Sequence, residues 1–337
     1  MKERVIYLDA LRVLSCFMIV CMHSPMPTGG IGIFNAGLSY ITAPGLVMFF
    51  MISGALLLPV KTDTKTFLKR RLSKVVLPTI VFTLIYLVIK HLHGESFGWT
   101  IALLSMPFST QGHGVLWFMY TLIGLYLLAP ILSHWLKFVS KRELQAYLLL
   151  WGLTLCLPIF KQFLTVNSTE TSSLYYFSGY AGYFVLGHYL KRYGAEMKLL
   201  PWIVLSIFAL LAYPLSKICL GDVELNGVFW YLSVTVAVMA ITLYLIVFNL
   251  FKSEDGGGKI LGSITTASNL SFGIYLVHII VMRDFIWKLD FISEISNYIL
   301  QTFVIIILTY MVSFTLVYVI SLIPGAEYII GYRRRLR

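Results

Sequence analysis

Charged side chains are scarce in this sequence of 337 residues. Asp, Glu, Lys and Arg together make up only 12% of the chain, against about 25% in an ordinary soluble domain. Hydrophobic residues make up 58%, and the mean hydropathy is +0.84. Because so many apolar side chains cannot all be buried in one aqueous core, the composition excludes a soluble protein.

Cysteine is scarce as well. The chain has four cysteines, Cys16, Cys21, Cys156 and Cys219. Their positions form neither the pairing framework of a disulfide-rich protein nor the ligand spacing of a zinc site. We therefore expect no metal in this protein.

The apolar residues are concentrated in runs of about 20, which is long enough to cross a bilayer as a helix. Ten candidate spans cover residues 8–25, 39–60, 75–91, 114–136, 144–163, 174–190, 199–217, 228–250, 267–287 and 298–323. The polar stretches between them are too short for a separate soluble domain. The sequence therefore predicts an all-α polytopic membrane protein with about ten transmembrane helices, formed by a single domain over 1–337.

Positive charges are distributed unevenly between the two sides of these spans. If the N-terminus is cytoplasmic, 21 of the 26 Lys and Arg residues fall on the inner side, as the positive-inside rule requires. We therefore expect both termini in the cytoplasm and membrane lipids as partners of the basic residues. A nucleic-acid partner is not expected, because that function needs a basic patch on a soluble face.

The first span holds three ionisable residues, which are costly in a membrane and are candidates for function. Arg12 and His23 are 11 residues apart, close to three helical turns, so they share a face over about 16 Å. Asp9 lies one turn before Arg12. Two interpretations stay open: this polar stripe is the wall of a cavity, or Asp9 and Arg12 are an interfacial anchor and His23 only caps the helix.

A basic segment precedes the third span. Six cations lie between Lys61 and Lys74, and the spacing of Arg71 and Lys74 puts them on one helical face. Such a cluster could bind a cytoplasmic polyanion such as coenzyme A or a nucleotide, because guanidinium groups fork onto phosphate oxygens. The simpler alternative is that these charges only set the topology.

Aromatic residues at the expected outer side of the membrane and a second histidine within a span are further candidates for function. Trp117 and Tyr120 belong to the stretch 112–120; they fit an interfacial belt or a platform for a sugar ring. His278 lies inside the ninth span. A single buried histidine is either a structural residue or a functional one, and spacing alone does not decide between them.

Together these residues resemble the acyltransferase family 3 membrane proteins, which O-acylate sugars of bacterial surface polysaccharides and related acceptors. Asp9, Arg12 and His23 match the family's Asp-x-x-Arg motif and its pattern of Arg, ten residues and His. Residues 67–74 resemble its Arg-x-x-Arg segment. Here that segment ends in Lys74, which keeps the charge but lacks the planar fork of arginine. Residues 116–130 and 270–278 are similar to two further stretches of the family.

The resemblance implies transfer of an acetyl or other short acyl group from cytoplasmic acyl-CoA, most often acetyl-CoA, to a hydroxyl of an extracytoplasmic or lipid-linked sugar. The protein would then lie in the bacterial cytoplasmic membrane. In this scheme His23 is the general base or a transient acyl carrier.

Further roles follow from the same scheme. Three basic residues bind the acyl donor, three residues lie on the acceptor side or in the cavity, and Asp9 pairs with a basic group near the inner surface. The donor-binding residues are Arg12, Arg71 and Lys74, and the acceptor-side residues are Trp117, Tyr120 and His278.

A function of a different class also fits a polar stripe within ten spans. A secondary transporter or flippase for a glycan or lipid-linked sugar would use that stripe as a translocation path. The sequence shows no paired helices broken by Gly or Pro in matching halves, which transporters of this kind often have. A third alternative is an assembly partner with an inactive site, which would tolerate the loss of His23.

Overall fold

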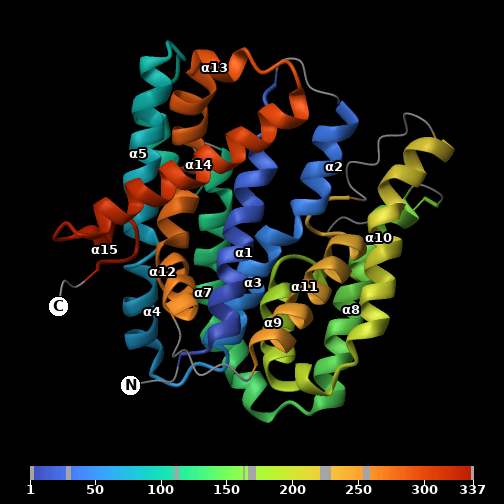
Figure 1. The fold of residues 1–337 in the computed structure, drawn as a ribbon. Coiled ribbons are helices and arrows are strands. Elements are labelled where there is room, and N and C mark those ends of the chain that lie inside the picture. Colours follow the sequence, from blue (N-terminus) through green and yellow to red (C-terminus); the bar gives the residue numbers. More distant parts are fainter. Residues whose placement is uncertain are drawn as a thin grey trace.

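The structure is a computed structural model that describes residues 4–27, 32–108, 110, 114–161, 164–165, 172–220, 229–252 and 259–334. In this part of the chain every regular element is a helix, so the expected all-α fold is confirmed (Figure 1). Nine segments of the described residues are long and apolar enough to cross a membrane. The protein is therefore an all-α polytopic membrane protein.

The helices of these nine segments follow the expected spans closely. They are α1 (Ile6–His23), α2 (Gly32–Thr42) with α3 (Pro44–Leu57), α4 (Thr64–Leu72) with α5 (Val76–Leu92), α7 (Trp117–Phe138), α8 (Lys141–Phe160), α10 (Leu199–Leu220), α11 (Val234–Phe251), α12 (Lys259–Ile280) and α14 (Tyr298–Ser321). The short helices α6 (Trp99–Ser105), α13 (Asp290–Ser293) and α15 (Ala326–Ile329) lie between or after them.

The sixth expected span, 174–190, forms a shorter helix than expected. Its helix α9 (Ala181–Tyr193) has 13 residues, or about 20 Å, which is less than the roughly 30 Å of a hydrocarbon core. A 3-10 turn and Gly179, whose φ of 93° is left-handed, precede it and delay its start. This helix is therefore not among the nine segments that are long enough to cross a membrane.

The second expected span is broken near its start. Thr42 ends α2 and Pro44 begins α3, because proline lacks the N–H that would continue the helix and its ring clashes with the preceding turn. The hydroxyl of Tyr40 donates to the carbonyl of Ala209, which fixes α2 against α10. The break gives α2 and α3 separate directions in the bundle (Figure 1).

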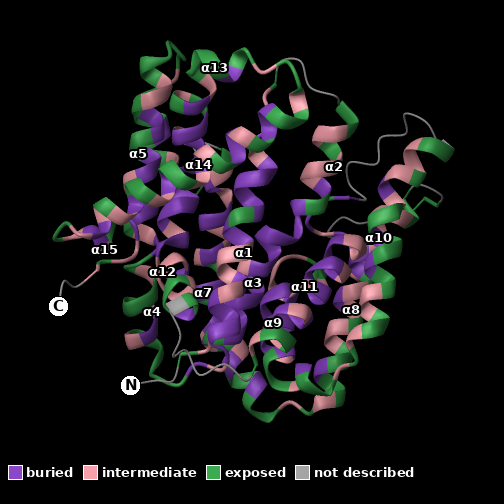
Figure 2. Ribbon diagram, viewed as in Figure 1, coloured by how far each residue is buried: buried purple, intermediate pink, exposed green. Residues whose placement is uncertain are grey.

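The centre of the bundle is α3, which packs against α1, α9 and α11. It is apolar on all sides and mostly buried (Figure 2). Two glycines bring α3 and α9 into backbone contact. A Cβ at Gly54 would lie 1.7 Å from the carbonyl oxygen of Phe184, and one at Gly187 would lie 1.8 Å from that of Met51. Small residues of this kind let membrane helices approach closely.

Helix α12 packs against α1 and changes its geometry just after His278. The next residues, Val281–Phe285, form a π-helix. A π turn holds one residue more than an α turn and is frequent at functional sites. The end of α12 that carries His278 is thus irregular.

Candidate functional site

An ionic cluster ties the beginning of α1 to α12. The Asp9 side chain is buried, and its Oδ2 pairs with Nε of Arg4. Its Oδ1 lies 3.7 Å from Nη1 of Arg12 and accepts a hydrogen bond of 2.6 Å from Oγ of Ser268. The sequence placed Asp9 beside Arg12 or another basic group, and in the structure it contacts two arginines. The carboxylate therefore balances two charges that would otherwise repel each other.

The variant Asp9→Asn tests this balance. We expect it to lower the free energy of unfolding by about 1–3 kcal/mol, since two arginines lose a partly buried partner. Ser268→Ala removes the hydrogen bonds of the Ser268 hydroxyl to Asp9 and from Arg12 but keeps the ion pairs, so it should cost only about 1 kcal/mol. Thermal unfolding of the detergent-solubilised protein measures both. Equal losses for the two variants would contradict an electrostatic role for Asp9.

Two histidines meet at the opposite end of α1. The rings of His23 and His278 lie 5.5 Å apart, centroid to centroid, with an angle of 38° between their planes. His278 is completely buried, and its Nδ1 is 2.6 Å from the carbonyl oxygen of Tyr275. Because a carbonyl only accepts, the neutral His278 ring carries its proton on Nδ1. The structure thus brings together two histidines that the sequence placed in separate spans.

A cluster of aromatic rings lies near the same end of α1. The Trp117 ring lies 5.3 Å from that of Tyr180 and 5.6 Å from that of Tyr231. The hydroxyl of Tyr231 contacts Sδ of Met22, the residue before His23, at 3.0 Å. This places Trp117 in a cluster of rings that reaches the end of α1.

Tyr120, predicted together with Trp117, makes a different contact. Its hydroxyl donates to the carbonyl of Met106 at 2.7 Å, after the end of α6. Residues 112 and 113, which open the same sequence stretch, lie outside the described residues. The two predicted aromatic residues therefore have different surroundings.

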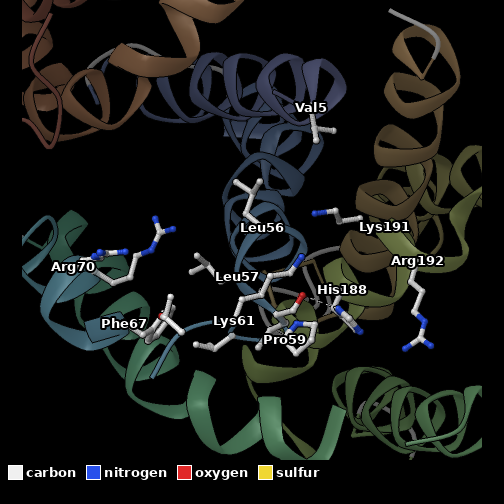
Figure 3. A pocket seen from close by; sticks show the side chains of 14 residues that line it. Val5, Leu56, Leu57, Pro59, Lys61, Phe67, Arg70, His188, Lys191 and Arg192 are labelled. Carbon is white, nitrogen blue, oxygen red and sulfur yellow. Dashed lines mark hydrogen bonds between the residues drawn. The ribbon is translucent and has the colours of Figure 1, made fainter. Parts of the chain in front are cut away.

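A basic cavity of about 800 Å³ lies next to the N-terminal end of α1, between α4 and α9. It is lined by Val5, residues 56–62 and Phe67, by Arg70 and Arg71 of α4, and by His188, Lys191 and Arg192 of α9 (Figure 3). Five of these described lining residues are lysine or arginine, and none is Asp or Glu. The cavity therefore attracts anions.

The last turns of α4 and α9 supply four of the five positive charges. The backbone N–H of Thr66 donates to Oδ2 of Asp63 at 2.8 Å and caps α4. This hydrogen bond holds the pKa of the Asp63 carboxyl below its usual value, so the cap stays ionised. Arg70 and Arg71 then fall in the last turn of α4, where the helix dipole favours positive charge.

Only part of the predicted donor-binding set lines the cavity. Arg71 does, whereas Arg12 and Lys74 are not among its described lining residues. Arg12 is nonetheless near enough to interact electrostatically with Arg71, which lines the cavity. Lys74 is exposed where α4 leads into α5.

The α9 wall of the cavity is not predicted from the sequence, in which Lys191 and Arg192 only add to the positive charge of the expected inner side. The sequence carries no local spacing that links α9 to α4. One signal was available: His188 precedes this basic pair by three and four residues, which puts all three side chains on one helical face.

The comparison with known families decides the class of this protein. A profile described as an acyltransferase domain, of acyltransferase family 3, matches residues 5–318, which is nearly the whole chain. The chain belongs to acyltransferase family 3. No curated protein and no solved structure gives a match.

The family 3 match includes both ends of the site. It covers the histidine pair and the whole basic cavity. The protein is therefore a membrane acyltransferase, and the match does not favour the transporter or flippase. Among the residues that the structure describes, no three His, Cys, Asp or Glu side chains are grouped closely enough to hold a metal.

Proposed function

We propose that this acyltransferase moves an acetyl or other short acyl group from acyl-CoA to a hydroxyl of an extracytoplasmic or lipid-linked sugar, in the bacterial cytoplasmic membrane. One observation carries the proposal. The basic cavity and the histidine pair lie at opposite ends of α1, so a phosphate-binding region and a proton-accepting group are joined by one helix.

The size and charge of the cavity support an acyl-CoA donor. A volume of about 800 Å³ is within the usual range for a bound small molecule or cofactor. Five cations without an acid among the described lining residues suit a ligand with several phosphates, and Arg70 and Arg71 can each contact two phosphate oxygens. Acyl-CoA carries three phosphate groups at one end of a long molecule.

The separation of the two regions supports the same donor. Val5 lines the cavity and His23 ends α1, so about 27 Å of helix lies between them. Only an extended carrier can place its phosphates at one end and its reactive thioester at the other. A small donor such as acetyl phosphate cannot reach both.

The chemistry at His23 is a proton transfer coupled to acyl transfer. In the direct route the neutral imidazole takes the proton of the sugar hydroxyl, and the hydroxyl oxygen attacks the thioester carbonyl. The C–S bond then breaks, and the coenzyme A thiolate leaves and takes up the proton from the imidazolium. In the two-step route His23 carries the acyl group before the sugar receives it. His278 lies beside His23 and would position the His23 ring in either route.

The aromatic cluster around Trp117 supports a sugar acceptor. An aromatic ring can pack against the apolar face of a sugar while hydroxyl groups fix its orientation. Tyr180 and Tyr231 flank Trp117, and the half-buried Tyr180 provides a hydroxyl group. The acceptor would approach from this end of α1, opposite to the donor.

Turnover of acetyl-CoA by the purified protein in lipid nanodiscs, with candidate sugars added, tests the proposal. Free coenzyme A and acylated sugar should appear together. Arg71→Gln should raise the KM for acetyl-CoA by about tenfold with little change in kcat, because one charged contact to phosphate is lost. The control Lys69→Gln changes an exposed cation of α4 that is not among the described lining residues and should leave the KM unchanged. Equal effects of the two variants would contradict donor binding in this cavity.

A further inference from the structure

His188 of α9 has one ring nitrogen that no described residue satisfies. The residue is only 6% exposed, and its Nδ1 lies 3.1 Å from the carbonyl oxygen of Leu58. Its other nitrogen, Nε2, is buried and has no hydrogen-bond partner among the residues that the structure describes. His188 lines the basic cavity. A buried polar atom of this kind in a cavity wall is a position where a bound ligand or an ordered water can supply the missing partner.

The chemistry of the ring tells what kind of partner this is. Since the Leu58 carbonyl can only accept, Nδ1 of His188 carries the proton, and Nε2 of the neutral ring is an acceptor. Lys191 and Arg192 follow by three and four residues on the same helical face. Their positive charges oppose a further positive charge on the ring. The neutral ring of His188 therefore offers an acceptor in a cavity whose described charged side chains are all donors.

The position of His188 is also fixed before any ligand binds. The preceding residue, Gly187, is in backbone contact with α3, and Nζ of Lys191 donates to the carbonyl of Ala55 at 2.8 Å. Figure 3 shows His188 and Lys191 on the side of the cavity opposite Arg70, with Leu56, Leu57 and Pro59 between the two sides. A ligand would thus meet two basic walls and one acceptor held in place.

We propose that Nε2 of His188 accepts a hydrogen bond from a hydroxyl or amino group of the nucleoside in the acyl carrier, while the cations of both walls bind its phosphates. This assignment rests on the proposed function for the identity of the carrier. It makes the cavity selective for a nucleoside phosphate over a bare polyphosphate or a phosphate headgroup. An ionised phosphate offers only acceptors and gains nothing from a neutral His188.

Binding of two probes by the full-length protein in nanodiscs, measured by calorimetry, tests the proposal. The probes are adenosine 3′,5′-bisphosphate and pyrophosphate. His188→Asn keeps an amide N–H for the Leu58 carbonyl but has no atom at the position of Nε2. We expect it to weaken binding of the adenosine bisphosphate by about tenfold and to leave pyrophosphate binding unchanged. The control His134→Asn, at an exposed position of α7, should change neither.

Equal weakening of both probes by His188→Asn would overturn the proposal, because the ring would then only position the cations. Unchanged binding of both would overturn it as well. A second test needs no variant. Analogues that lack the ribose 2′-hydroxyl, or whose adenine amino group is dimethylated, each remove one donor from the nucleotide. One of them should bind the wild-type protein about tenfold more weakly; equal binding of both and the parent would overturn the assignment.

These readouts separate the inference from the proposed function. Acetyl-CoA turnover tests the reaction, whereas bisphosphate binding tests the cavity. Selective nucleotide binding without any turnover would contradict the proposed reaction and leave the role of His188 intact. Turnover of acetyl-CoA by a protein that binds adenosine bisphosphate and pyrophosphate without selectivity would support the proposed reaction and contradict the role of His188.

Discussion

Replacing His23 by alanine is expected to lower the rate of acyl transfer by about 10²–10⁴-fold, the usual contribution of a general base. Without the imidazole, no group at this end of α1 is assigned to take the proton of the attacking hydroxyl. If His23 instead carries the acyl group, the same variant stops the reaction at its first step. The measurement is the release of coenzyme A in the presence of a sugar acceptor.

The control for this variant is His134→Ala. His134 is an exposed histidine of α7 whose ring contacts Phe138, so its loss should leave the rate unchanged. Both variants should retain the unfolding temperature of the wild type, which separates chemistry from folding. A His23→Ala protein that is folded and transfers acyl groups at the normal rate would contradict the proposed mechanism.

The second large effect is on folding. Gly54→Ala is expected to lower the free energy of unfolding by about 3 kcal/mol or more, or to prevent folding. The added Cβ would lie 1.7 Å from the oxygen and 2.6 Å from the carbonyl carbon of Phe184, both backbone atoms. No rotamer change can relieve this overlap, so α3 and α9 must move apart. The thermal stability in detergent, followed by size-exclusion chromatography, measures the loss.

Gly152→Ala is the matched control for Gly54→Ala. Gly152 lies within α8, and a Cβ at this position would meet no atom within 4 Å. Alanine there should raise stability by about 0.5–1 kcal/mol, because glycine is unfavourable inside a helix. If both variants have the same stability, the close contact between α3 and α9 is not a determinant of the fold.

The membrane helices were largely predictable because the apolar runs are long and the charges between them are clear. The span expected at 298–323 is α14 (Tyr298–Ser321), and the one at 199–217 lies within α10 (Leu199–Leu220). The short length of α9 was not predictable from hydropathy. An apolar run packed within the protein gives the same signal as one that crosses the lipid.

The candidate site was predictable only where its residues are near one another in the sequence. Arg12 and His23 share a face of one helix, so their spacing was informative. The contact of His23 with His278 and the meeting of α4 with α9 at the cavity join residues far apart in the chain. Such contacts depend on how the helices pack, which local spacing does not contain.

The absence of acids from the described lining of the cavity has a consequence for how fast a donor arrives. Unbalanced charge acts beyond contact distance, over a Debye length of about 8 Å at physiological ionic strength and about 30 Å in 0.01 M salt. In a dilute buffer the five cations therefore attract an anionic carrier from well outside the cavity, and association is accelerated. In the cell this attraction is confined to the entrance, so free polyanions compete with the donor mainly by direct contact.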